Sequence, residues 1–173
     1  MLPVRLRPIS IRYCSLMGQG RKPLLGVGSS GCLCSLRAVP LFQGLTAELE
    51  AKGPDADGAL RRIDEALALA SETGERACES LLHRLRGEIL LKRDPANTAA
   101  AEEVFRTAIA IAHAQKARSF ELRTALLLAK LHQSTGRFAE AHAVLSPALE
   151  GFSPTPEMPE IAEAQALLAS HRA

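Results

Sequence analysis

The chain has 173 residues, of which 47% are hydrophobic and 23% charged, and this composition is ordinary for a single packed domain. Only six side chains are aromatic, and 28 of the 29 alanines lie beyond residue 46, so we predict an all-α protein whose helices cross closely at alanine. The formal net charge of +2 combines six basic and no acidic residues in residues 1–47 with 15 basic and 19 acidic residues in the remainder. The apolar runs, such as Ala125–Ala129, are far shorter than the ~20 residues of a membrane-spanning helix, which excludes such a span.

Residues 1–39 form a segment of different character. They contain three of the four cysteines and no stretch with helical or strand periodicity, so we expect this basic segment to be disordered. We interpret it as a non-native start attached to a fragment of a longer gene product. Two alternatives stay open: a targeting peptide, and a lipoprotein signal ending at Cys32, which would make the chain an exported, lipid-anchored repeat protein. Without such a signal we expect a cytoplasmic protein.

Residues 40–173 are predicted to form one helical domain of about seven helices. Glycine and proline stand at the breaks between apolar periodic segments, where they terminate helices. Thr98 is the expected N-cap of one helix, because its hydroxyl can accept a hydrogen bond from a free backbone amide of the first turn. The predicted helices cover residues 40–52, 57–73, 76–93, 98–115, 118–135, 138–150 and 158–171.

The domain contains an internal repeat. Three segments share the same spacing of small, large, small and aliphatic residues, and successive copies begin 42 and 40 residues apart. The copies are Ala59, Ile63, Ala66, Leu67; Ala101, Phe105, Ala108, Ile109; and Ala141, Leu145, Ala148, Leu149. Gly87 and Ala129 take the small place in the helix that precedes a copy, and Gly136 takes the turn. A period of this length is typical of solenoids built from helical hairpins.

The last copy resembles the tetratricopeptide repeat (TPR), in which small residues mark the crossings of antiparallel helices and a glycine makes the turn. Longer stretches within residues 73–91, 114–123 and 139–147 are similar to the C-terminal helical repeats of large predicted bacterial ATPases, which are often fused to adenylate/guanylate cyclase or winged-helix DNA-binding domains. The resemblance covers residues 40–173. It implies a short TPR-like solenoid that acts in protein-protein interaction or signal transduction, as a fragment of a signalling ATPase, a cyclase or a transcriptional regulator.

We expect no catalysis, no cofactor and no metal. No glycine-rich phosphate loop ending in Lys and Ser or Thr occurs. The five histidines include no pair at the i, i+4 spacing that places two imidazoles on one helix face for zinc, so we interpret them, His132 and His142 among them, as surface residues. Cys78 stands alone in the helical region and is expected to pack as a small apolar side chain.

The expected partner is a protein or peptide, bound along the face built by the first helix of each pair. Arg123, Lys130 and Gln133 are predicted to project there, and Arg84 and Glu88 are further candidates. Basic side chains in such a groove could hold the acidic end of a peptide. The acidic excess beyond residue 47 argues against a nucleic-acid partner, whose phosphates require basic side chains.

The last helix is predicted to cap the array. Ile161, Ala164, Leu167 and Leu168 give it one apolar stripe, which leaves Glu160 and Glu163 outward.

A second hypothesis is a helical ligand-binding or enzymatic domain that uses the groove near His83, Arg84 and Glu88.

Overall fold

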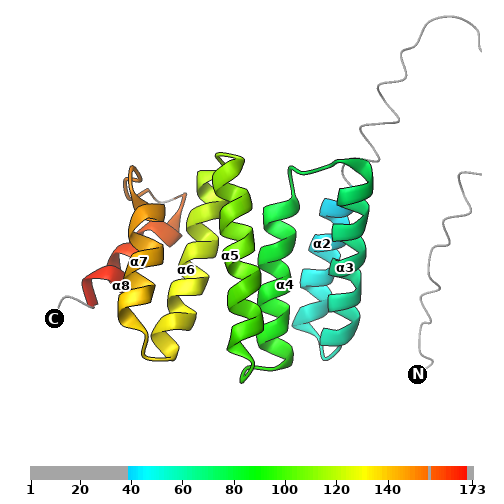
Figure 1. The fold of residues 1–173 in the computed structure, drawn as a ribbon, viewed down its shortest axis with the longest axis horizontal. Helices are drawn as coiled ribbons and strands as arrows, with labels where there is room; N and C mark the ends of the chain where they lie inside the picture. Colours follow the sequence, from blue (N-terminus) through cyan, green and yellow to red (C-terminus); the bar gives the residue numbers. More distant parts are fainter. Residues whose placement is uncertain (1–38, 156, 171–173) are drawn as a thin grey trace, which may run out of the picture.

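The computed structural model describes residues 39–155 and 157–170, and within them the chain is all-α. Its helices stand side by side in one row (Figure 1). They are α2 (Val39–Lys52), α3 (Ala56–Thr73), α4 (Glu79–Arg93), α5 (Thr98–Ala114), α6 (Arg118–Ser134), α7 (Phe138–Leu149) and α8 (Pro159–Ser170). The predicted all-α fold is confirmed, and none of the described helices is both long and apolar enough to cross a membrane. The disorder and the Cys32 signal expected of the N-terminal segment concern residues outside this described part.

Consecutive helices pack as hairpins, α2 with α3, α4 with α5 and α6 with α7, and α8 closes the row. The helices α2, α4, α6 and α8 also touch one another along the row, whereas α3, α5 and α7 make no comparably close approach among themselves. A stack of hairpins curves toward the helices that approach more closely. We therefore call α2, α4, α6 and α8 the inner helices, and their common surface the inner face.

The core is built where small residues let helices cross. The alanines of the repeat are all buried: Ala59, Ala66, Ala101, Ala108, Ala129, Ala141 and Ala148. Gly87 is buried as well, and a Cβ atom placed there would lie 2.5 Å from Cε1 of Phe105. The backbone of α4 thus runs directly over the phenyl ring of α5. Such close crossings leave little room for bulky side chains, which accounts for the scarcity of aromatic residues.

Helix ends follow the predicted breaks, with two corrections. Helix α4 begins at Glu79 rather than at residue 76. The backbone carbonyl of Arg76 accepts from the backbone N–H of Glu79 (3.2 Å), which closes a turn before the helix, and also from Nε2 of Gln115 (2.6 Å). Thr98 is the first residue of α5, and the N-cap position belongs to Asn97.

Gly136 makes the turn between α6 and α7 with a φ of 76°, in the left-handed region. An L-residue pays roughly 1 to 2 kcal/mol in that region, because its Cβ crowds the following carbonyl. Space around the position is open, so conformation alone sets the cost. We expect Gly136→Ala to lower the free energy of unfolding in urea by about 1 kcal/mol, and Gly136→Asn to lower it less, because Asn enters this region more easily. Equal stability of the alanine variant and the parent would contradict the assignment.

Candidate functional site

The five residues predicted to bind a partner all lie on inner helices. Arg84 and Glu88 belong to α4, and Arg123, Lys130 and Gln133 belong to α6. None of the five is on an outer helix, so the repeat register placed them on one side of the row. Their side chains are nevertheless engaged in different ways.

Arg84 and Glu88 form an ion pair within α4. Burial raises the pKa of the Glu88 carboxyl, and the positive charge of Arg84 works in the opposite direction. His83, the third residue of the alternative groove, is half-buried, and burial lowers its pKa. Arg84 and Glu88 are thus bonded to each other on the inner face, as their i, i+4 spacing favours.

A pocket of about 190 Å³ opens between α2 and α4, beside Glu88. Its lining combines apolar and charged side chains: Glu48, Ala51, Lys52, Leu85, Glu88, Ile89 and Lys92. The ammonium group of Lys92 donates to the backbone carbonyls of Ala51 and Gly53, which closes the C-terminal end of α2. Glu48 and Glu88 lie near enough for the charge of Glu48 to raise the pKa of Glu88 further. The pocket therefore has an apolar floor and a rim with two neighbouring carboxylates.

The basic residues of α6 are paired with the last helix. Nε of Arg123 lies 3.0 Å from a carboxylate oxygen of Glu160, and Nζ of Lys130 lies 2.7 Å from one of Glu163. Glu163 is exposed, as expected, whereas the side chain of Glu160 is only 27% exposed and lies against α6, so the expectation that it faces outward is wrong. Gln133, one turn further along α6, is half-buried. The acids of α8 thus occupy the place foreseen for an acidic peptide end.

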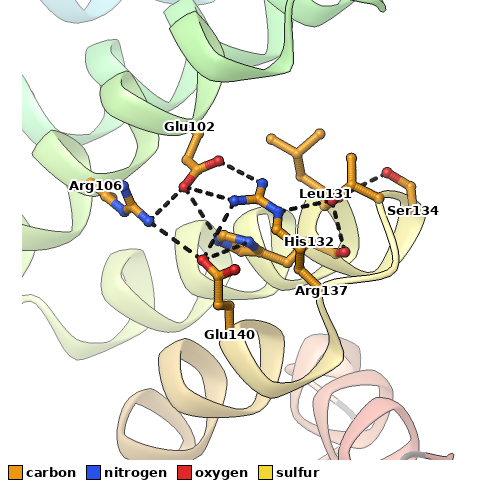
Figure 2. A network of polar contacts seen from close by, with 8 residues as sticks. Glu102, Arg106, Leu131, His132, Ser134, Arg137 and Glu140 are labelled. Atoms are coloured by element: carbon orange, nitrogen blue, oxygen red, sulfur yellow. Dashed lines mark hydrogen bonds and ion pairs between the residues drawn. The ribbon is translucent and has the colours of Figure 1, made fainter.

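A polar cluster on the other side of α6 was not foreseen (Figure 2). Arg137, in the α6–α7 turn, donates to both carboxylate oxygens of Glu102 on α5, at 2.6 and 3.3 Å. Arg106 lies 2.5 Å from the same carboxylate, and Glu140 of α7 lies 3.4 Å from Arg137. Glu102 is largely buried, and its bonds to Arg137 hold the pKa of its carboxyl below the ordinary value. These charge-assisted bonds tie α5 to the following hairpin.

His132 lies at the centre of this cluster, and its interpretation as a surface residue is wrong. Its side chain is fully buried, and neither ring nitrogen has a hydrogen-bond partner among the described residues. Nε2 lies 3.9 Å from Glu102 and Nδ1 lies 3.7 Å from Glu140. Burial lowers the pKa of the imidazole, and the nearby Arg137 lowers it further. The spacing of Glu121, Thr124, Leu128 and His132 along one side of α6 was the signal available in the sequence.

Glu102, His132 and Glu140 each offer one donor atom within 4.8 Å of the others, a spacing that a metal ion could use. Both carboxylates, however, are bonded to guanidinium groups, and the cations Arg106 and Arg137 would repel a divalent ion. Such an ion could enter only if both arginines moved. The geometry therefore describes an ion-pair network rather than a prepared coordination site.

Comparison of the chain with protein-family models, curated proteins and solved structures finds no match. The functional argument therefore rests on the two places just described. The charged side chains of the polar cluster are paired with one another within the protein. The inner face, by contrast, presents a solvent-open pocket with an apolar floor and a charged rim.

Some residues of the longer sequence runs connect neighbouring helices and loops. Besides the bond from Gln115 to Arg76, Arg118 donates to the backbone carbonyl of Glu150 at 2.6 Å, and this ties the start of α6 to the end of α7. Glu121 is buried and lies 3.3 Å from Arg118 and 3.1 Å from His113. These side chains thus fix the positions of loops and helix ends, a role that the spacing of residues in the sequence did not indicate.

Proposed function

We propose that this chain is a non-catalytic, TPR-like interaction or regulatory module that binds a peptide segment of a protein partner along its inner face. The observation that carries the proposal is the pocket between α2 and α4, which opens on the surface where helical solenoids bind their partners. The resemblance to the C-terminal repeats of signalling ATPases and cyclases supports a regulatory role. The proposal keeps the cytoplasmic location expected from the sequence.

The pocket favours one side chain of a peptide over a cofactor. Small-molecule sites usually have volumes of roughly 300 to 1,000 Å³, whereas this pocket has about 190 Å³. Leu85 and Ile89 at its floor are almost fully buried (1% and 2% exposed), so an aliphatic side chain would pack mainly on the methylene groups of the charged side chains that line the pocket.

The charges at the rim change the expected peptide. Arg123 and Lys130 are already paired with α8, so an acidic peptide end would have to displace Glu160 and Glu163. Glu88 is paired with Arg84, whereas the pair of Glu48 with Lys52 is long (3.9 Å) and exposed, so a cation of the peptide can replace Lys52 beside Glu48. We therefore propose a peptide in which an aliphatic residue is flanked by Lys or Arg.

The test is a selection of displayed random peptides on the full chain, followed by calorimetric titration of an enriched peptide. We expect the double variant Glu48→Gln with Glu88→Gln to bind that peptide at least tenfold more weakly, because the rim loses both negative charges. Glu65→Gln with Glu103→Gln, at exposed positions of the outer helices α3 and α5, is the matched control and should leave affinity unchanged. A selection without enrichment, or equal weakening in both double variants, would refute the inner face as the binding site.

A further inference from the structure

The large hydrophobic side chains that remain exposed are concentrated on the first inner helix. In the described residues they are Phe42 (64% exposed), Leu45 (41%), Leu49 (66%) and Phe138 (49%). Three of these four belong to α2, at a spacing of three and then four residues, and so form one stripe on a helix. We call Phe42, Leu45 and Leu49 the leading stripe. It lies opposite the buried side of α2, which contains Gly44 and Ala47.

The same positions are buried one repeat later. Residues 40 positions beyond the leading stripe are Leu82, Leu85 and Ile89 of α4, and these belong to the core shared with α2 and α3. The copies of the sequence repeat in α3 and α5 are 42 residues apart, and the inner helices α2 and α4 match at an offset of 40, at which Ala47 corresponds to Gly87, both of them buried. The leading stripe is therefore the surface by which an inner helix docks on the hairpin before it, and in α2 it has no such hairpin among the described residues.

The surface that receives this stripe consists of small residues. A Cβ atom placed on Gly44 would collide with Leu82 and would lie 3.7 Å from Cδ1 of Leu85, so the small side of α2 meets the large stripe of α4 directly. That small side contains Pro40, Gly44 and Ala47, which are spaced by four and then three residues.

The other end of the row presents the matching small surface. On α8, Ala162, Ala166 and Ala169 have the same spacing of four and three residues, and all three are exposed. They lie on the side of α8 opposite Ile161, Ala164 and Leu167, which are buried against the preceding hairpin. We call these three alanines the trailing stripe. Among the described residues, α4 and α6 are covered on both sides, whereas α2 lacks a cover on its large side and α8 on its small side.

We propose that the two ends meet between copies of this chain. The leading stripe of one copy packs on the trailing stripe of another, head to tail, and repeats the contact that α2 makes with α4 inside each copy. The fit of the two ends to each other, rather than to a third surface, is what identifies a second copy as the occupant. Because different surfaces meet, the contact is heterologous and can continue from copy to copy. Since the described residues include no outer helix after α8 to add contacts of the kind that α3 makes with α4, the association is weak and depends on concentration.

The test measures the mass of the full chain in solution by sedimentation and light scattering across a range of concentrations. We expect the weight-average mass of the parent to rise with concentration past that of a dimer. Leu45→Gln with Leu49→Gln removes the leading stripe, and Ala166→Glu blocks the trailing stripe. Each variant alone should stay monomeric, while an equimolar mixture of the two should form a heterodimer and nothing larger. Phe138→Ser removes the remaining exposed large hydrophobic side chain, on α7, and should assemble like the parent.

Three results would overturn the proposal. The parent could stay monomeric at every concentration. Ala166→Glu could assemble as well as the parent, which would place the contact between two α2 helices. The α2 amides could be protected from hydrogen exchange in a monomer, which would mean that another segment of the same chain covers the leading stripe. Thermal unfolding of each variant separates loss of assembly from loss of fold, since all the substituted side chains are exposed.

Discussion

Truncation of Phe105 to alanine should lower the free energy of unfolding by about 3 to 5 kcal/mol, the cost typical of deleting a buried phenyl ring. The ring is fully buried in α5, lies under Gly87 of α4, and shares a core with Leu128 and Leu131 of α6. It therefore holds one hairpin together and joins that hairpin to the next. Urea unfolding, followed by circular dichroism, measures the loss.

A double-mutant cycle with Gly87 isolates the close crossing from the general cost of a cavity. In the parent, the new methyl group of Gly87→Ala would meet three ring atoms at 2.5 to 2.9 Å, and overpacking of this kind costs ~1 to 3 kcal/mol. In the Phe105→Ala background the ring is gone, and the higher helix propensity of alanine should stabilise by about 1 kcal/mol. The two substitutions should therefore couple by at least ~1 kcal/mol. Additive effects would show that α4 and α5 do not cross at this point.

The fold was predictable because helix ends and helix crossings are recorded locally in the sequence. Gly74 and Gly136 lie at the predicted breaks with positive φ, and the alanines of the repeat are buried at the predicted period. The start of α4 was not predictable in this way. Residues 76–78 have no local signal against a helix, and the turn that they form instead is also contacted by the side chain of Gln115, 39 residues further along the chain. Such distant contacts are invisible to periodicity.

The inner face was predicted only in part, for a similar reason. The repeat register placed Arg123 and Lys130 on inner helices, but which charges remain available depends on where α8 comes to lie. The helical pattern showed that α8 has an apolar stripe, and it did not show that its acids would face α6. The interpretation of His132 as a surface residue was wrong for a different reason, because it relied on the rule that polar residues are usually exposed. Its position on a buried face followed from helical spacing, and this spacing was the stronger signal.

The exposed stripes at the two ends of the row also depend on which helices lie beside them. A repeat array gives each inner helix one side toward the hairpin before it and one toward the hairpin after it, and only the first and last helices have a side without a neighbour. The sequence repeat identified small positions that are buried, but it did not identify the exposed stripes of α2 and α8. Exposure of Leu49 is a property of position in the row, since its counterpart Ile89 is buried in α4.

Lowering the pH below 6.5, the ordinary pKa of a histidine, should destabilise the protein. Burial lowers the pKa of His132 in the folded state, with a further contribution from Arg137, although Glu102 and Glu140 oppose this shift. The unfolded chain therefore takes up a proton on this residue at a higher pH than the folded chain does. Stability falls as the pH decreases from 6.5 toward the lower pKa of the folded state. His83, whose pKa is lowered by burial, contributes in the same direction.

Replacement of His132 by leucine should remove part of this pH dependence and raise stability. A buried polar group without a hydrogen bond costs roughly 1 to 3 kcal/mol, and leucine of similar size carries no such cost. We expect His132→Leu to be more stable than the parent by about 1 kcal/mol at neutral pH. Between pH 6.5 and pH 4.5, the ordinary pKa values of histidine and glutamate, the variant should lose less stability than the parent. Below pH 4.5, the ordinary pKa of a glutamate, protonation of Glu102 in the unfolded chain adds a further loss of stability in both proteins, because the pKa of this carboxyl is lowered in the folded state.

Urea unfolding at a series of pH values, with an NMR titration of the His132 ring in the folded parent, checks both expectations. If the ring titrates above pH 6.5, the charges of Glu102 and Glu140 outweigh burial and the two arginines. The folded state then holds the imidazolium as part of the ion-pair network. In that case the leucine variant would be less stable than the parent, because Glu102 and Glu140 would lose a cation between them. The direction of the stability change therefore decides whether His132 is a neutral ring buried at a cost or the charged centre of the link between two hairpins.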